Sequence, residues 1–384
     1  MLPLIIKKDH LERDIRAVSF AKIIRRRMNI GRIFYYLLVF IPLCIFFGIF
    51  TQFHLIIFVT AILSLVPLAR IMGYAANEIV LQSNPMISGL ISATFGNMIE
   101  LLIAVFALKE GKHLIPLIQA SLIGSIICNI LLLVGLSIFV GGLRYRYQRF
   151  NNQAVAVSST MLIIVVAGLA IPSVYAYITP QPQPDHLHLM SVAVAVVMAI
   201  IYIAGLVFSL WTHKDMFEVS SEVKSLQERP VLSKQYAAFI LFLSVLVVSI
   251  ICEFLVKTVE TVATTIGITQ TFIGIVLVGI VTNIAENATA IRFAIQNKIN
   301  VSIEIGLNSA IQIALFVVPI IMIVSSIFSF GFTLVFSMFE ILAVILAVLI
   351  INYLSSDGRC NWLEGAQLLS VYFIIAIAFF FIKN

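Results

Sequence analysis

Two glutamates lie deep inside long apolar stretches of this sequence. Glu100 falls within the apolar run 86–108, and Glu286 falls within the run 269–296. An ionised carboxylate inside a lipid bilayer is costly, so such residues usually belong to a functional site. A protonated glutamate could instead form a structural hydrogen bond between helices. Because acids within a membrane generally mark ion or proton pathways, we favour a transport site over the structural role.

The two glutamates have similar surroundings. Both segments read Asn-x-x-Glu-x-x-x-Ala, with Asn97 in the first copy and Asn283 in the second. This spacing places the amide and the carboxylate on one face of a helix. Gly96, one turn before the first glutamate, allows the backbone to open and to offer a carbonyl oxygen to an ion. Thr282 occupies the corresponding position in the second copy.

Polar side chains recur in the apolar run that follows each glutamate. They are Gln119, Ser121, Ser125 and Asn129 after the first glutamate, and Asn308, Ser309 and Gln312 after the second. With the two carboxylates and freed backbone carbonyls, they would form a site made only of oxygen ligands. Such sites suit hard cations, Ca²⁺ above all. Neither His nor Cys occurs at these positions, which disfavours zinc and copper.

The composition requires lipid, not water, as the solvent. Of the 384 residues, 61% are hydrophobic and 11% are charged, against about 45–50% and about 25% in ordinary globular proteins. This excludes a water-soluble enzyme, a nucleic-acid-binding protein and a disordered chain. The net charge of +6 fits Lys and Arg held against an anionic cytoplasmic leaflet. The four cysteines form no CxxC pair, so neither a zinc site nor a disulfide framework is indicated.

The apolar runs predict an all-α membrane protein with eleven transmembrane helices, because each crossing needs about 20 apolar residues. The runs are 33–50, 55–81, 86–108, 114–141, 153–178, 187–211, 235–257, 269–296, 301–325, 332–354 and 363–382. Lys and Arg concentrate in the N-terminal arm and in the connections on its side, which predicts a cytoplasmic N-terminus and a C-terminus on the opposite side. The short arm and short loops favour a prokaryotic inner membrane, with an organelle or vacuolar membrane as the alternative.

The longest connection divides the chain into one leading helix and two sets of five. We expect a basic arm at 1–32, a leading transmembrane helix and loop at 33–54, a first five-helix repeat at 55–211, a cytoplasmic linker with an acidic helix at 212–234, and a second five-helix repeat at 235–384. An odd number of spans per repeat inverts the second copy relative to the first. Inverted repeats with interrupted polar helices are typical of secondary transporters.

At these residues the sequence resembles the cation/proton exchanger family, the Ca²⁺/H⁺ antiporters of the calcium–cation antiporter superfamily. The resemblance extends from about residue 55 to the C-terminus. Its motifs are Gly96-Asn97-x-x-Glu100, Gln119-Ala120-Ser121-Leu122-x-Gly124-Ser125, Asn283-x-Ala285-Glu286-x-Ala288, Ser309-x-x-Gln312-Ile313-Ala314-Leu315-Phe316 and the loop Asp357-Gly358-Arg359-x-Asn361-Trp362-Leu363-Glu364-Gly365. The resemblance implies the same one-five-five arrangement, with Glu100 and Glu286 as the exchange carboxylates.

The sequence departs from the family pattern close to both glutamates. Met98 and Ile99 stand where the family usually has small residues, and Thr282 stands where it usually has glycine. Asn287 replaces a family histidine. This replacement bears on pH dependence and ion selectivity, because an amide cannot titrate. We count Asn129, Asn308 and Asn287 as accessory candidates.

Acids outside the central pair are weaker candidates. Within the linker, Asp215, Glu218 and Glu222 line one helical face, where the family has an acidic helix that resembles a cytosolic Ca²⁺ sensor. A solvated amphipathic linker explains the same pattern, and both interpretations stay open. Glu78 matches a family position at the end of the second span. It would be either a proton-path group or a structural polar residue.

The sequence therefore favours a secondary antiporter that exchanges Ca²⁺ for H⁺ by alternating access, with the two ions competing for the glutamates. A Na⁺/Ca²⁺ or other cation exchanger is the main alternative, and a cation channel is less favoured. We expect no enzymatic activity, since the sequence has no HExxH motif. We expect no cofactor, because Ca²⁺ is the transported substrate. The expected partners are Ca²⁺, H⁺ and the lipid bilayer. The sequence is compatible with a homo-oligomer, and we expect no nucleic acid as a partner.

Overall fold

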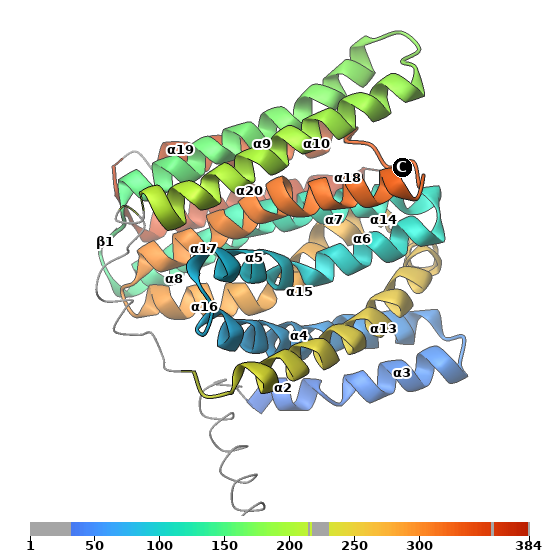
Figure 1. Cartoon of the computed structure of the whole chain (residues 1–384), viewed down its shortest axis with the longest axis horizontal. Coiled ribbons are helices and arrows are strands. Elements are labelled where there is room, and N and C mark those ends of the chain that lie inside the picture. Colours follow the sequence, from blue (N-terminus) through green and yellow to red (C-terminus); the bar gives the residue numbers. More distant parts are fainter. Residues whose placement is uncertain (1–31, 214–215, 217–229, 355–356, 383–384) are drawn as a thin grey trace, which may run out of the picture.

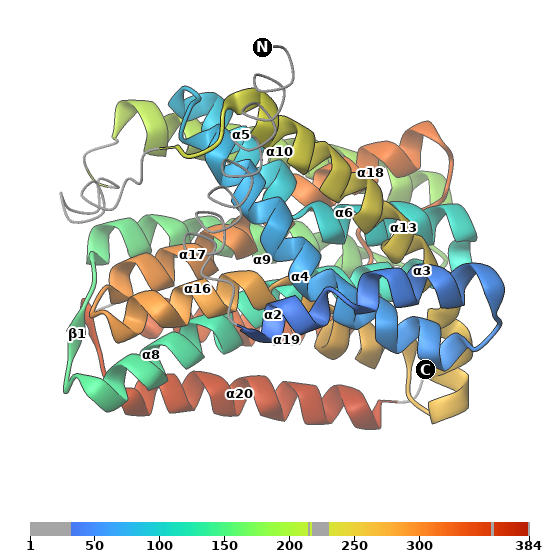
Figure 2. The same ribbon diagram turned by 90° about the horizontal axis from the view of Figure 1, so that it is seen from below.

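The structure is a computed structural model, and it describes residues 32–213, 216, 230–354 and 357–382. The basic arm and the acidic linker residues Asp215, Glu218 and Glu222 lie outside these described residues. Long helices run side by side along one direction and form a bundle (Figure 1). The strands of the described part are β1 (Gln148–Arg149) and β2 (Arg359–Cys360), which pair antiparallel at one end of the bundle. The C-terminal end of α20 (Trp362–Phe381) lies at the other end of the bundle (Figure 2).

The first half of the chain contains long helices, one of them sharply bent. Its elements are α2 (Arg32–Leu37), α3 (Phe40–Phe50), α4 (His54–Val80), α5 (Pro85–Gly96), α6 (Met98–Glu110), η1 (Lys112–Leu114), α7 (Ile115–Ile127), the π-helix η2 (Cys128–Leu133), α8 (Val134–Arg144), α9 (Asn152–Ile178), α10 (Pro184–Val207) and the π-helix η3 (Phe208–Thr212). The helices α5 and α6 meet at an angle of 53°. The elements α7, η2 and α8 follow one another without a break and form one long span. The elements α10 and η3 likewise form one long span.

The second half contains helices of the same kinds in the same order. Its elements are α13 (Lys234–Ile266), α14 (Gln270–Phe272), the π-helix η4 (Ile273–Val278), α15 (Gly279–Thr282), α16 (Ile284–Ile295), α17 (Ile299–Gln312), the π-helix η5 (Ile313–Val317), α18 (Val318–Ile327), α19 (Met338–Leu354) and α20 (Trp362–Phe381). The segment from α14 to α15 meets α16 at 55°, close to the angle of the first bend. The long helices α4 and α13 have corresponding places in the two halves, and they pack against each other.

The helices agree with the predicted membrane-crossing character of the chain. In the described residues, seven helices are long and apolar enough to cross a membrane, or nine if each bent pair counts as one span. Two shorter apolar helices, at Phe34–Phe50 and Met338–Leu354, lie where the first and tenth spans were predicted. The protein is therefore a nearly all-helical, multi-pass membrane protein.

Two predicted span boundaries were wrong. The helix predicted at 235–257 continues as α13 to Ile266. The span predicted from residue 332 begins only at Met338, because residues 330–337 are not helical. In that segment Phe332, Leu334 and Phe336 are buried in alternation, which is the period of an extended chain. Serine hydroxyls on neighbouring helices accept hydrogen bonds from its backbone amides, at 3.1 Å for Leu334 and 2.8 Å for Phe336.

An asparagine produces each of the two sharp bends. The side-chain amide of Asn97 donates to the carbonyl oxygen of Ala93 at 3.0 Å, and that of Asn283 donates to the carbonyl of Gly279 at 2.8 Å. Both asparagines leave helical geometry, with φ and ψ of −111° and 23° for Asn97 and of −96° and 5° for Asn283. A side chain that bonds the carbonyl four residues earlier competes with the helical backbone bond, which favours a break at this point.

Glycines allow the centre of the two halves to pack closely. A Cβ atom added to Gly124 on α7 would lie 2.5 Å from the Cα of Ile275 in η4, and one added to Gly279 would lie 2.7 Å from the backbone of Gly124. Only residues without a side chain permit two helix backbones to approach this closely, as is common between helices in membranes. The crossing holds the two bends near each other.

Candidate cation site

Glu100 lies at the bend of the first half, in contact with the second half. It stands in the first turn of α6 and its side chain is 2% exposed. The hydroxyl of Ser125 on α7 donates to its Oε1 at 3.5 Å, and the hydroxyl of Thr282 lies 3.3 Å from that of Ser125. Thr282 also neighbours the carboxyl group itself. Hydroxyls from both halves therefore surround the first glutamate.

Glu286 has the corresponding position in the second half. It stands in the first turn of α16 and is partly buried, with Ser309 of α17 beside its carboxyl group. A Cβ atom on Gly96 would lie 4.0 Å from its Oε1, so the absence of a side chain there leaves the carboxyl group open toward the first bend. The two carboxyl groups are close enough to interact electrostatically. Each stands at a helix N-terminus, where the macrodipole favours negative charge.

Amide side chains link the two bends across the halves. Asn97 Nδ2 donates to Gln312 Oε1 at 3.1 Å, and Asn129 Nδ2 donates to Asn283 Oδ1 at 2.9 Å. Asn129 also donates to the hydroxyl of Ser309 at 3.0 Å. Each bend asparagine is thus held by an amide residue from the other half of the chain.

Several buried oxygens in this region have no hydrogen-bond partner among the described residues. They are Oε2 of Glu100, Oε2 of Glu286, Oδ1 of Asn129 and Oδ1 of Asn287. A buried acceptor without a partner costs free energy, so such groups point to an ion or a proton that binds there. Within the described residues, no group of three or more His, Cys, Asp or Glu side chains could hold a metal ion. The two carboxyl groups, with the amide and hydroxyl oxygens near them, are donors of the kind that would suit a hard cation.

Not every predicted site residue joins this cluster. The amide of Gln119 instead donates to the carbonyl of Val335 at 2.7 Å and to that of Thr333 at 3.4 Å, in the irregular segment before α19. These contacts hold the amide nitrogen of Gln119 at that segment, and a role of Gln119 in the cation site stays a prediction. Asn308 is exposed on a different face of α17 from Ser309, which is buried.

Glu78 has a structural environment. Its Oε2 accepts hydrogen bonds from the backbone amides of Val231 at 2.8 Å and Leu232 at 3.0 Å, just before α13 begins. The side chain of the nearby Gln82 also donates to the carbonyl of Leu232 at 3.0 Å. Of the two roles open for Glu78 from the sequence, these contacts favour the structural one.

The structure adds one neighbour to the site that the sequence pattern did not reveal. Cys128, the first residue of η2, is fully buried beside Asn287 and close to both glutamates. The residue is one turn beyond Gly124 in the first half, but its contact with Asn287 joins residues from different halves. Spacing along the sequence cannot show such a contact.

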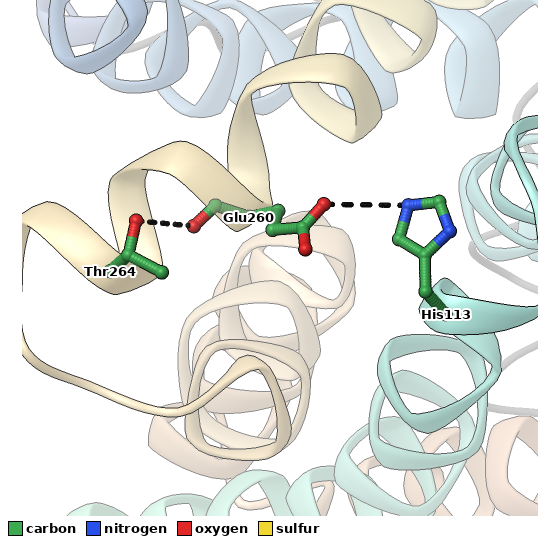
Figure 3. A network of polar contacts seen from close by, with 3 residues as sticks. All are labelled: His113, Glu260 and Thr264. Atoms are coloured by element: carbon green, nitrogen blue, oxygen red, sulfur yellow. Dashed lines mark hydrogen bonds and ion pairs between the residues drawn. The ribbon is translucent and has the colours of Figure 1, made fainter.

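An exposed pair of polar side chains lies away from this cluster. His113, in η1, lies 3.4 Å from Glu260 on α13, and both side chains are about half exposed, at 52% and 55% (Figure 3). The connection between α6 and α7 and the end of α13 lie at the end of the bundle opposite β1 (Figure 1). Such exposed pairs usually contribute about 0–1 kcal/mol. Glu260 is therefore a suitable reference carboxylate outside the site.

The fold defines a multi-pass membrane protein with two bent helix pairs, and comparisons with known proteins show its family. The family described as sodium/calcium exchanger protein matches residues 53–211 and 236–381. The Ca²⁺/H⁺ antiporter ChaA of Bacillus subtilis is 38% identical over 327 residues, covering 85% of this chain and 92% of the relative. A Ca²⁺/H⁺ antiporter of Synechocystis is 38% identical over 367 residues, covering 91% and 98%.

A solved structure shows the same fold. The crystal structure of the Ca²⁺/H⁺ antiporter protein YfkE is 36% identical, with a TM-score of 0.79, and covers 92% of this chain and 100% of that chain. The chain therefore belongs to the sodium/calcium exchanger protein family. The family resemblance and the transporter class predicted from the sequence are confirmed.

Proposed function

We propose that this protein is a secondary antiporter that exchanges Ca²⁺ for H⁺ across a membrane. The observation that supports it most is the pair of glutamates at the two bends, each with an unpartnered oxygen. The relatives named as Ca²⁺/H⁺ antiporters match almost the whole chain at 38% identity. The same ions are therefore the proposed substrates here, and the protein acts as a transporter, not as an enzyme.

The proposed coupling is a competition between Ca²⁺ and protons for Glu100 and Glu286. An unpaired carboxylate is costly to bury, so each glutamate needs either a cation or a proton when the site is closed to water. One Ca²⁺ balances the charge of both carboxylates, and protonation neutralises them in the other loaded form. The empty, doubly charged site is then the form least able to pass through the closed state. Exchange follows because the two loaded forms move and the empty form does not.

The proposed scaffold is eleven spans, with one leading helix and two inverted five-helix repeats that move around the fixed pair. The shared order of helices, the bends of 53° and 55°, and the π-helical segment after α7 and after α17 support it. Inverted repeats that meet at broken helices provide alternating access in many transporters. Asn97, Asn283, Ser125, Ser309, Gln312, Gly96 and Thr282 would complete the site around the two carboxylates.

We also propose that the end of the bundle with β1 and β2 faces the cytoplasm, and that the protein lies in a prokaryotic inner membrane. The basic connection that carries Arg144, Arg146 and Arg149 lies at this end, and Arg359 belongs to β2. The C-terminal end of α20 lies at the other end. Single cysteines placed at residues 1 and 384 in sealed vesicles test this orientation. Labelling of both from the same side would contradict it.

The function is tested with purified protein in sealed liposomes. A pH gradient should drive Ca²⁺ movement against its concentration gradient, and dissipating the pH gradient with a protonophore should stop it. The description of the family makes Na⁺ the main competing coupling ion, so a Na⁺ gradient at equal pH is the second arm. Uptake with Na⁺ alone would replace the proposal by Na⁺/Ca²⁺ exchange. Ca²⁺ flux that only follows its own gradient would indicate a channel.

A further inference from the structure

One face of α17 carries a ladder of polar side chains toward the paired glutamates. Asn300, Glu304, Asn308 and Gln312 are spaced four residues apart, so they lie on neighbouring turns of one helix face. None of these four side chains is buried, and Asn308 is exposed, although the opposite face of α17 is packed in the protein core. The face extends about 12 Å from Glu304 to Gln312 at 1.5 Å per residue.

The two ends of this face contact polar groups inside the protein. A row of amides and a carboxylate against lipid tails would lose its hydrogen bonds to water at a cost of several kcal/mol. At its inner end, Gln312 Oε1 accepts a hydrogen bond from the side-chain amide of Asn97 at the first bend. At its outer end, Asn300 Oδ1 accepts the backbone amide of Asn151 at 2.7 Å, next to β1. The ladder therefore connects the β1 end of the bundle with the bend region.

A second open face lies on α5, which packs against α17. Ser92 and Gly96 are one turn apart and both are exposed, although they lie far from the start of α5. Apart from Glu286, nothing lies within 4 Å of the position that a Cβ of Gly96 would take. Gly96, on the exposed face of α5, therefore lies next to the carboxyl group of Glu286.

Glu304 is the one carboxylate of the ladder, and its neighbours hold it in place. Asn300 Nδ2 donates to Glu304 Oε1 at 3.0 Å, while the other end of the Asn300 amide is fixed by Asn151. The other carboxylate oxygen, Oε2, receives no hydrogen bond within the described part of the chain. The cytoplasmic connections are rich in Lys and Arg, which repel a divalent cation. When ionised, the Glu304 carboxylate places a negative charge at this point, which offsets that repulsion locally.

We infer that Glu304 is the carboxylate of the α17 ladder that receives a divalent cation from the cytoplasmic side, and that it passes the ion along Asn308 and Gln312 to Glu286. This role rests on the proposed exchange function. Glu304 captures the ion and does not take part in the exchange step itself. Its removal should therefore weaken the apparent affinity for Ca²⁺ from one side and leave the maximal rate unchanged.

The test compares Glu304→Gln with the wild-type protein and with Glu260→Gln, in sealed liposomes with the two orientations assayed separately. Glu260→Gln is the matched control, because it makes the same charge change at the opposite end of the bundle. For Ca²⁺ supplied at the β1 end, Glu304→Gln should raise the KM about threefold, the size expected when a unit charge about 12 Å from a divalent ion is lost in water. The maximal rate should stay at the wild-type value, and the KM difference should shrink in high salt.

Three results would overturn the inference. They are an unchanged KM at the β1 end, an equal rise in KM from both sides, and a fall in maximal rate with unchanged KM. Glu304→Asp, which keeps the charge, should restore most of the affinity and separates loss of charge from a folding defect. A wild-type protein without pH-driven Ca²⁺ transport would contradict the proposed function itself, and this reference measurement distinguishes the two failures.

Discussion

The amide nitrogen of Asn97 lies 3.1 Å from Oε1 of Gln312, although the two residues are 215 positions apart in the chain. Asn97 bends the first half by bonding the carbonyl of Ala93, and Gln312 belongs to the second half. The converse contact joins Asn129 of the first half to Asn283 at the second bend, at 2.9 Å. Each bend is therefore held by a contact from the other half of the chain. A substitution in one half should consequently affect the bend in the other half.

This reciprocity predicts coupling between Asn97 and Gln312. Each single alanine variant should weaken Ca²⁺ binding, and the double variant should be scarcely weaker than the worse single one. The coupling should be about 0.5–1.5 kcal/mol, the usual net value of a hydrogen bond. The measurement is the apparent Ca²⁺ affinity of the four proteins. Gln119→Ala is the control, since its amide holds the segment before α19 and should leave the affinity unchanged. Additive losses would contradict the coupling.

Neutralising either central glutamate should abolish exchange. Glu100→Gln and Glu286→Gln retain the shape and hydrogen bonding of the side chain but remove a ligand charge and a titrating group. Each should lower the rate of pH-driven Ca²⁺ transport by about 100-fold or more. This factor corresponds to a cost of roughly 3 kcal/mol for one missing ligand charge. The variants should keep the elution volume and melting temperature of the wild type. Exchange close to the wild-type rate in either variant is the outcome that rules out the paired-carboxylate mechanism.

The close crossing of the halves predicts a sensitive glycine. A Cβ on Gly124 would lie 2.5 Å from the Cα of Ile275, so Gly124→Ala must separate two backbones. Overpacking of this kind costs about 1–3 kcal/mol. The melting temperature in detergent should fall by several degrees. Gly73→Ala on α4 is the control, because nothing lies within 4 Å of its added Cβ. Equal melting temperatures for the two variants would show that the crossing tolerates a side chain.

Much of the fold follows from apolar runs in the sequence, because helices alone satisfy their backbone hydrogen bonds within a membrane segment. The boundaries of α9 at Asn152–Ile178 and of α20 at Trp362–Phe381 fall within a residue or so of those predicted. The start of α19 was missed since Phe332, Leu334 and Phe336 are as apolar as a helix but alternate in burial. Composition alone does not distinguish the two arrangements.

The paired glutamates and their asparagines could be found from the repeated pattern, whereas their partners could not. The pattern places Asn and Glu on one helix face, but it does not show that Asn129 reaches Asn283, 154 residues away. Gln119 shares the polar stripe of α7 in sequence, yet its amide reaches the carbonyl of Val335. The polar spacing of Glu304, Asn308 and Gln312 was a usable signal for the ladder on α17. Packing between halves decides which of these side chains meet.

Competition between the two ions at Glu100 and Glu286 also sets the expected pH dependence. As the pH falls, protons occupy the carboxylates that Ca²⁺ requires, so the apparent Ca²⁺ affinity should fall. As the pH rises, the carboxylates lose their protons and the affinity should increase toward a plateau. Asn287→His should leave most of this steepness intact, because the glutamates carry it. A Ca²⁺ affinity that does not change across the neutral range in the wild type would contradict direct competition.

Proton release on Ca²⁺ binding is the most direct test of the central claim that one pair of glutamates binds Ca²⁺ or protons. Calorimetric titration of the purified protein with Ca²⁺, in buffers of different ionisation enthalpy at one neutral pH, gives the number of protons released per ion bound. The account predicts a clear release in the wild type, and its loss together with Ca²⁺ binding in Glu286→Gln. Tight Ca²⁺ binding with a proton count near zero throughout the neutral range would contradict proton coupling and would favour exchange with Na⁺.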